Sequence, residues 1–389
     1  MVNGFFLMQD IHLPISQLYK LMLLALMAFR VFFTKDFLFF LVLLLAFQIA
    51  PLGGLIKSGN FLTFIEDVVL ATKWLTIPLS FFYFKAIFQA SYFSKIYNWL
   101  KYAVYFALFF LFINLSLGAL GFGMSFYFHG YGNAVGTRGF IYAGNELTIL
   151  VLTIGFLVAI YLKQIKSYFL FVIGFLLFVI FAFLITSKTV LGGVLIVFLI
   201  PWVSTLSRKI STKWLKLAFL IALLAIPLLI GVFYYGIKKS GVVEKLKTSR
   251  EMNDGDFLQT LLSNRNNFLI DGWQAFSNNY NVFEKVFGLG QSYYVNLVDS
   301  IPELDFFTLL FTNGYFGLLA LLLLIFYWFL NAKHLSQNKD NMYANSVILF
   351  LFFITISSNL AGHIFSSAIA GFYIGLSLAI MFMNKKKLS

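Results

Sequence analysis

The sequence predicts an all-α, polytopic membrane protein. Of its 389 residues, 61% are hydrophobic and only 11% are charged, and the mean hydropathy is +0.89. A soluble domain usually has about 25% charged residues, so this chain could not cover its apolar surface in water. Several apolar runs exceed the roughly 18 residues that mark a membrane-spanning helix. The basic residues gather in alternate loops between these runs, as they do in membrane proteins.

Eleven hydrophobic spans are predicted. Each is expected to be helical, because a backbone exposed to lipid has no other way to satisfy its polar groups within one segment. The spans lie near 15–33, 37–56, 68–93, 101–121, 145–162, 167–186, 189–206, 214–236, 306–330, 345–359 and 365–384. They divide the chain into eight helices (1–236), a large polar loop (237–305), and three helices with a basic tail (306–389).

Charge predicts the orientation of the spans. One set of alternate loops, with the tail after residue 384, holds fifteen basic residues and two acids, and therefore carries the whole net charge of +13. The positive-inside rule places this set in the cytoplasm, so we expect a multi-pass plasma-membrane protein with a cytoplasmic C-terminus. The basic excess is then topological, and no nucleic-acid partner is expected. The N-terminus falls outside, so residues 1–14 are either a short external lead or follow a missing span. No cleavable signal peptide is apparent, and the first span would be its own insertion signal.

The scarcity of cysteine and histidine narrows the possible chemistry. The chain has no cysteine, which excludes disulfides, thiolate catalysis and Cys-ligated metals. Its four histidines are scattered, so we expect neither a metal site nor a cofactor.

The loop 237–305 is predicted to contain an interfacial helix. Ser263 is a plausible N-cap, and Phe268, Leu269, Trp273 and Phe276 recur at helical spacing. Arg265 shares a face with Phe268, Leu269 and Gly272, so its guanidinium is expected to point with the apolar side toward the bundle or the headgroups. The sequence "FGLGQ" (287–291) predicts a glycine turn.

Arg138, Asn145 and Glu146 lie where the chain enters the fifth span. A structural interpretation has Arg138 reaching to lipid phosphate while Asn145 caps the helix. The alternative is that Arg138 binds a phosphate of a substrate, because a guanidinium matches phosphate oxygens bidentately and stays charged. Asn145 and Glu146 are then further candidates for substrate binding.

Two further basic residues are candidates for substrate binding. Lys188 lies in the short outer turn "ITSKTVLGG" (185–193), where it either anchors the interface or adds a second charge to the same site. Arg250 lies in the more polar stretch "KTSREMNDGD", and solvation is the simpler interpretation.

Carboxylates precede the ninth span in "SIPELDFFTLLFTNGYFG" (300–317). Ser300 and Glu303 fit a capping box, and Asp305 suits a helix N-terminus. Alternatively, Glu303 or Asp305 accepts a proton from a sugar hydroxyl, which requires hydrogen-bonding reach to that oxygen. Gly314 and Gly317 are interpreted as packing residues.

Other polar residues have simpler interpretations. Glu66, Asp67 and Lys73 near the third span are expected to pair locally. His363, in the last outer turn, is interpreted as an interfacial polar residue.

The order of these motifs resembles a known family. "RGF" and "GNE" enter a span, "TSK" forms a tight outer turn, "NR" begins a loop helix, and "FGLG" and "ELDFFTLLFTNGYFG" follow. Over roughly residues 120–330 the chain resembles the O-antigen polymerase and ligase superfamily, in particular Wzy-type polymerases of capsules and exopolysaccharides. Ligase members have a histidine in the large loop, and 237–305 has none. The resemblance therefore favours a polymerase.

The resemblance implies a glycosyltransferase that joins polyprenyl-pyrophosphate-linked repeat units outside the cytoplasm. Arg138 and Arg265 would contact the pyrophosphate, and Glu303 or Asp305 would lie near the acceptor. Arginines would stabilise the leaving phosphate without a metal, and a single displacement would invert the anomeric carbon. Membrane lipids are expected partners, as are a flippase and a chain-length regulator. The alternatives are a ligase-like transferase and a polysaccharide-unit transporter or flippase.

Overall fold

The described part of the chain is almost entirely helical. The computed structural model describes residues 15–90, 93–127, 135–206, 265–301, 303–338, 341–360 and 362–383. Within these residues, six helices are long and apolar enough to cross a membrane. The predicted all-α membrane class therefore holds for this part of the chain. The span at 214–236 and the cap Ser263 lie outside it, and the total of eleven spans stays a prediction.

The chain divides into two compact units. The first contains most of α5 (Phe93–Ala119), β1 (Met124–Tyr127), β2 (Val135–Gly139), α6 (Gly144–Gln164), α7 (Tyr168–Ile185) and α8 (Lys188–Leu206). In it, α6 is buried along most of its length and packs on α7 and α8.

The second unit is built from both ends of the described chain. Its elements are α2 (Ile15–Phe32), α3 (Phe37–Ser58), α4 (Phe61–Gln89), α12 (Arg265–Asn279), α13 (Val282–Phe287), α14 (Gln291–Val298), α15 (Asp305–Ser336), α16 (Met342–Ser358), α17 (Gly371–Ala379) and the 3-10 turn η1 (Ile380–Phe382). Helix α4 packs on α3 and α17, and α15 packs on α3 and α16.

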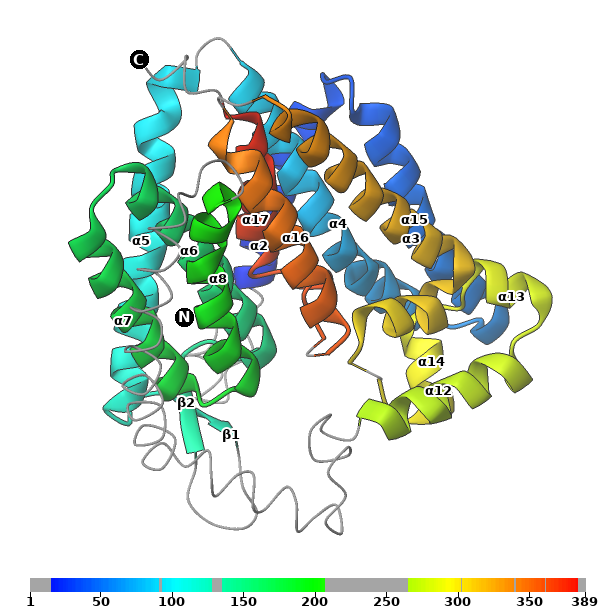
Figure 1. The fold of residues 1–389 in the computed structure, drawn as a ribbon. Helices are drawn as coiled ribbons and strands as arrows, with labels where there is room; N and C mark the ends of the chain where they lie inside the picture. Colours follow the sequence, from blue (N-terminus) through cyan, green and yellow to red (C-terminus); the bar gives the residue numbers. More distant parts are fainter. Residues whose placement is uncertain are drawn as a thin grey trace. The chain divides into compact units, whose positions relative to one another are not determined.

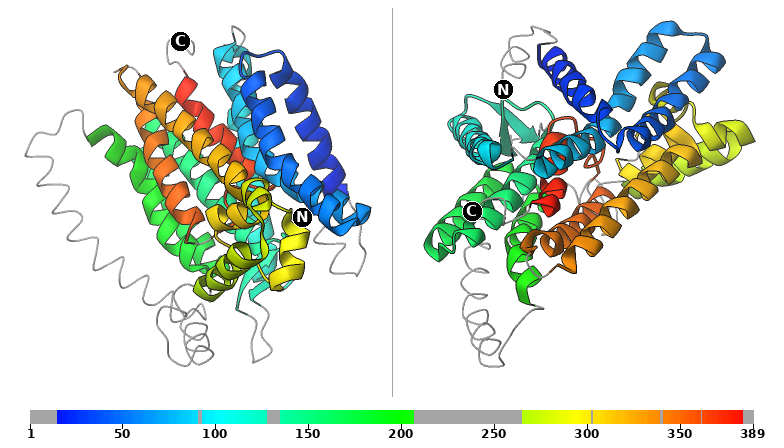
Figure 2. Two further views of the ribbon diagram at one scale, coloured as in Figure 1. Left: turned by 90° about the vertical axis from the view of Figure 1, so that its right-hand side faces the viewer. Right: turned by 90° about the horizontal axis from the view of Figure 1, so that it is seen from above.

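The three short helices of the large loop belong to this second unit. Helices α12, α13 and α14 gather at one end of α15 (Figure 1), and the same grouping is visible from the side (Figure 2). Their core consists of Phe276, Tyr280, Leu289, Tyr294, Leu310 and Phe311. We call this the loop end of the unit. The opposite end, where α3 begins, is called the triad end.

Several boundaries differ from the sequence-based expectation. Helix α4 begins seven residues earlier than the span at 68–93, because the Asn60 side chain accepts hydrogen bonds from the N–H groups of Leu62 and Thr63. Helix α17 begins only at Gly371, after a series of turns, so the last helix is shorter than 365–384. The prediction also lacked the antiparallel β1–β2 hairpin of the first unit.

Candidate functional site

The loop end is shaped by a break in α15. Gly314 has φ 67° and ψ −172°, outside the helical region, although α15 continues on both sides of it. The break leaves the Thr312 carbonyl accessible, and this oxygen accepts hydrogen bonds from the N–H groups of Leu289 and Gly290 at 3.2 and 2.9 Å. Gly314 was expected to allow close packing, and this is confirmed, because a side chain there would collide with the backbone of Val286 and Gly288. Its positive φ was not predicted, and it lets the membrane helix bind the loop.

The predicted glycine turn fits into this break. Gly288 and Gly290 both have positive φ, which favours glycine. A side chain at Gly288 would collide with the backbone of Thr312 and Asn313, and one at Gly54 of α3 would collide with the Leu289 carbonyl. The turn is therefore wedged between α3 and α15, which fixes where α14 and the following residues lie.

Arg265 and Glu303 meet at the loop end. The Nη2 atom of Arg265 lies 3.0 Å from Oε2 of Glu303, and its Nη1 donates a 2.9 Å hydrogen bond to the Leu360 carbonyl. The guanidinium thus joins the start of α12, the segment before α15 and the end of α16. The predicted face of α12 is the packed one, since Gly272 and Phe276 are buried. Trp273 is half-exposed, and the centre of its ring lies 6.4 Å from that of Phe311.

His363 completes this group. Its Nε2 lies 3.8 Å from Oε1 of Glu303. Glu303, Gly362 and His363 all have positive φ, of 54°, 68° and 55°, an uncommon conformation for residues other than glycine. Such backbone strain clusters at functional sites. We call Arg265, Glu303 and His363 the open cluster, because the Glu303 and His363 side chains are 41% and 34% exposed.

The open cluster holds Glu303 as a carboxylate. The proximity of His363, together with the charge and hydrogen bond of Arg265, lowers the pKa of the Glu303 carboxyl to about 2, against the opposing effect of burial. The capping box of Ser300 and Glu303 was wrong, because α15 begins at Asp305 with Leu304 as its N-cap and no side-chain cap. The Glu303 side chain is therefore directed to Arg265 and His363.

Asp305 is placed differently from Glu303. It is 2% exposed, and its Oδ2 accepts hydrogen bonds from the N–H groups of Ile364 and Phe365 at 2.8 and 2.7 Å. Its Oδ1 lies 3.3 Å from the Ser366 hydroxyl. Asp305 therefore anchors the turn that carries His363, and of the two candidate carboxylates only Glu303 reaches the surface.

Arg138 lies in the first unit, at the end of β2. Its Nη1 donates a 2.6 Å hydrogen bond to the Tyr142 carbonyl, and its guanidinium lies 5.2 Å from the centre of the Tyr142 ring. Its Nε is buried and has no hydrogen-bond partner among the described residues. A buried donor of this kind suits an oxygen of a bound anion.

Asn114 positions the Arg138 segment, and no sequence pattern predicted this role. This side chain of α5, 1% exposed, donates to the Arg138 carbonyl at 3.0 Å and accepts from the Phe140 N–H at 2.9 Å. The preceding Gly136 packs against Ile185 and Thr186, in the turn that leads to Lys188 at the start of α8. The segments of Arg138 and Lys188 are therefore neighbours.

The remaining candidates are placed as follows. Asn145 and Glu146 lie in the first turn of α6, whose N-cap is Ala143, so the predicted Asn145 cap was wrong. Arg250 lies outside the described residues. Among the residues that the structure does describe, no group of three His, Asp or Glu side chains could hold a metal ion.

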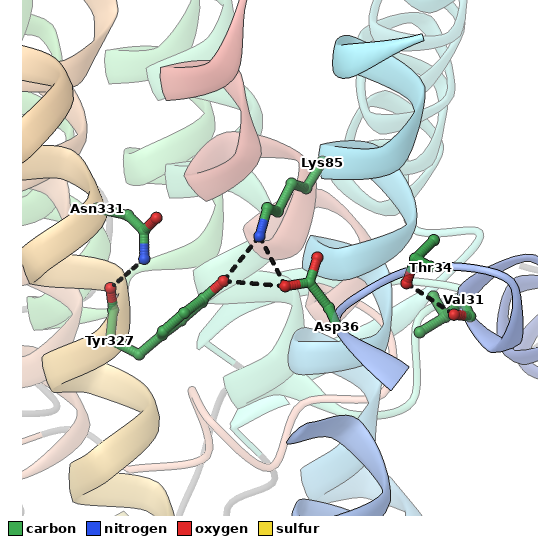
Figure 3. A network of polar contacts seen from close by, with 6 residues as sticks. All are labelled: Val31, Thr34, Asp36, Lys85, Tyr327 and Asn331. Carbon is green, nitrogen blue, oxygen red and sulfur yellow. Dashed lines mark hydrogen bonds and ion pairs between the residues drawn. The ribbon is translucent and has the colours of Figure 1, made fainter. Parts of the chain in front are cut away.

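A second charged group, at the triad end, was not predicted. Lys85 Nζ lies 2.7 Å from Asp36 Oδ1 and 2.8 Å from the Tyr327 hydroxyl, and the hydroxyl lies 3.2 Å from the same carboxylate oxygen (Figure 3). These three residues, here called the triad, connect the start of α3 with α4 and α15. Local sequence patterns could not predict this contact, because Tyr327 lies 242 positions from Lys85 and 291 positions from Asp36.

No protein-family model, curated protein or solved structure matches this chain.

Proposed function

We propose that the protein is a glycosyltransferase of the plasma membrane, which joins polyprenyl-pyrophosphate-linked oligosaccharide repeat units into a capsular polysaccharide or exopolysaccharide. The observation that carries the proposal is the open cluster. A guanidinium, a carboxylate and an imidazole meet on strained backbone, at the end of a bundle of apolar helices, on the loop expected to face outward. A lipid-linked substrate would present its pyrophosphate near the ends of the membrane helices.

The chemistry assigns a role to each side chain. Breaking a glycosyl–pyrophosphate bond leaves negative charge on the phosphate, which Arg265 would stabilise. Arg138 supports the same role independently, through its buried Nε donor. Arg138 belongs to the first unit and Arg265 to the second, and the role of each arginine is proposed separately.

The acceptor hydroxyl must lose its proton as it attacks. Glu303, with a pKa of about 2, is a weak base, and proton transfer is most efficient when the pKa of the base lies near the working pH. His363 is 3.8 Å away, and imidazole is the side chain that most often serves as a general base. We therefore assign proton acceptance to His363 and its orientation to Glu303. A single displacement would invert the anomeric carbon.

An assay in detergent tests the proposal. Lipid-linked repeat units would be extracted from a strain that lacks this protein and mixed with the purified protein, and the products would be separated by length. A ladder of repeat numbers supports a polymerase, and a single transfer product indicates a ligase-like transferase.

Variants test the roles of the arginines. Arg265→Ala and Arg138→Ala are each expected to reduce chain growth by at least about 100-fold, the usual effect of removing one donor to a developing charge. Arg30→Gln, on the opposite side of the predicted membrane, is the matched control and should be fully active. Normal polymer length in either alanine variant contradicts the assigned role.

A transporter is the second candidate, and one observation favours it. Helix α15 is interrupted inside the bundle at Gly314, and α3 contains Pro51. Interrupted helices line the substrate sites of many transporters. Proteoliposomes distinguish the two functions. Movement of an unpolymerised lipid-linked unit across the bilayer, with no polymer formed in detergent, would replace the polymerase by a flippase.

A further inference from the structure

A small cavity lies within the second unit, next to Pro51 of α3 and the break in α15. The cavity volume is about 10 Å³, which is enough for one water molecule or one ion. Pro51, Asp67, Trp74, Gln291, Thr312 and Asn313 are among its lining residues. They come from α3, α4, α14 and α15, so the cavity lies where four helices meet.

Asp67 brings an unbalanced charge to this cavity. It is 2% exposed. Its hydrogen-bond donors are neutral: the backbone of Gln291, and the N–H and hydroxyl of Ser292 at 2.7 and 2.8 Å. No ion pair to Asp67 exists among the described residues. Burying an ionised carboxylate without a countercharge is costly, so a bound cation would stabilise the folded state here. The predicted local pairing of Asp67 with Glu66 or Lys73 was therefore wrong.

The neutral side chains of the cavity offer oxygen ligands. Pro51 cannot donate a hydrogen bond to the Phe47 carbonyl, and the Asn313 amide nitrogen donates to that oxygen instead, at 2.9 Å. This bond fixes which atom of the Asn313 amide is oxygen. The Thr312 hydroxyl lies 2.8 Å from both this oxygen and the Thr308 carbonyl. The Thr312 hydroxyl has one proton and can donate it to only one of these two oxygens. The other oxygen then faces the hydroxyl oxygen at 2.8 Å without a hydrogen between them. A nearby cation would relieve the repulsion between these two oxygens.

We propose that this cavity binds one monovalent alkali cation through Asp67 and the side-chain oxygens of Gln291, Thr312 and Asn313. One carboxylate and one monovalent ion give a neutral buried site. A divalent ion is less suited, because Ca²⁺ sites use several carboxylates and Mg²⁺ keeps several waters, and the cavity has one carboxylate and little space. The ion would connect α4, α14 and α15 at the loop end. The inference does not rest on the proposed function, because its test needs no glycan.

Thermal unfolding of the purified full chain in detergent tests the site. The midpoint would be measured in lithium, sodium, potassium and choline chloride at equal ionic strength. One alkali cation is expected to raise the midpoint in a saturable manner relative to choline, by roughly 3 °C or more. Equal midpoints in all four salts overturn the proposal and leave the cavity to water or to a protonated Asp67.

Two variants assign the effect to the cavity. Asp67→Asn keeps an oxygen that can accept from Ser292 but removes the charge, and it should abolish the response to alkali cations. Glu66→Gln removes the neighbouring exposed charge, which does not line the cavity, and should retain the response. An unchanged response in Asp67→Asn shows that the cation acts elsewhere and overturns the site.

Tryptophan fluorescence gives a readout that does not depend on the folding of Asp67→Asn. Trp74 lines the cavity, so titration of the bound cation into the wild-type protein should change the emission with the same saturation as the midpoint. The change should vanish in Trp74→Phe. An emission that responds identically in Trp74→Phe contradicts the location.

Discussion

The second unit has charged groups at both of its ends, and they are built differently. In the triad, Lys85 and Asp36 are 11% and 20% exposed. Lys85 Nζ, Asp36 Oδ1 and the Tyr327 hydroxyl each contact the other two (Figure 3). In the open cluster, Arg265 is 14% exposed but its partner Glu303 is 41% exposed. The backbone of the triad is helical apart from the residues before α3, whereas Glu303 and His363 have positive φ.

This difference separates two uses of charge in an apolar bundle. A closed group of charges joins helices and offers little to a ligand, because its donors and acceptors are already used. An open group keeps one face for water or substrate and is held in place by strained backbone. The comparison predicts that changes in the triad act mainly on stability, and that changes in the open cluster act mainly on activity.

The largest effect on stability is expected in the triad. Lys85→Met removes one partner of a mostly buried ion pair and leaves the Asp36 carboxylate without its cation, which should cost about 3 kcal/mol of unfolding free energy. Denaturant unfolding in detergent measures this. The double variant Lys85→Met with Asp36→Asn should recover part of the loss.

A surface ion pair provides the control for this prediction. Lys57 of α3 lies 2.7 Å from Glu284 of α13 and is 32% exposed. Lys57→Met should therefore cost less than about 1 kcal/mol. Equal losses of unfolding free energy in the Lys57 and Lys85 variants would show that the triad stabilises the protein no more than a surface ion pair does.

An intermediate effect on stability is expected at Asp305. It lies beside the open cluster, but its side chain is buried and hydrogen-bonded, as in the triad. Asp305→Ala removes the acceptor of the Ile364 and Phe365 N–H groups and should cost about 2 kcal/mol. Glu303→Gln should cost under about 1 kcal/mol while reducing activity. The paired measurement of unfolding and glycan transfer tests this division, and a reversed order would contradict the assignment of Asp305 to structure.

The smallest effect is expected from the ionisation of Glu303. Because its pKa falls from 4.5 to about 2 on folding, its contribution to stability is complete above about pH 5 and is lost as the pH falls toward 2. The contribution is small, since the side chain is 41% exposed and screened by solvent. Acid unfolding of Glu303→Gln should therefore be slightly less steep between pH 5 and 2.

The same ionisation makes a prediction for activity. Glu303 stays ionised between pH 7 and 5, so a loss of transfer over this range should persist in whatever activity Glu303→Gln retains. A loss that is absent in this variant would assign it to Glu303 and contradict the prediction.

The helices were largely predictable from the sequence, because a membrane span depends on local composition. The ranges 37–56, 145–162 and 167–186 differ from α3, α6 and α7 by at most two residues at each end. Boundaries set by particular side chains were harder. The Asn60 cap extended α4, and the break at Gly314 could not be inferred, since glycine in an apolar helix more often marks close packing.

The candidate site was predictable only in part. Arg265 was identified because its place on an amphipathic face is a local property. Its contacts were not foreseen, because Glu303 and the Leu360 carbonyl lie 38 and 95 positions away. His363 and Asn114 were missed for the same reason: a lone histidine or asparagine carries no periodic signal. The positive φ of Glu303 replaced the expected capping box, and local sequence rules do not foresee such strain.

The wedge of residues 288–290 between α3 and α15 has a consequence for biogenesis. Asp67 and the Ser292 that it holds are 225 positions apart. At 5–20 residues per second, a ribosome needs about 10 to 45 seconds to make the intervening chain. During this time α3 and α4 are in the bilayer without residues 288–290, and the Asp67 carboxylate lacks its Ser292 donors. A chaperone or translocon component that shields α3 and α4 would act in this interval.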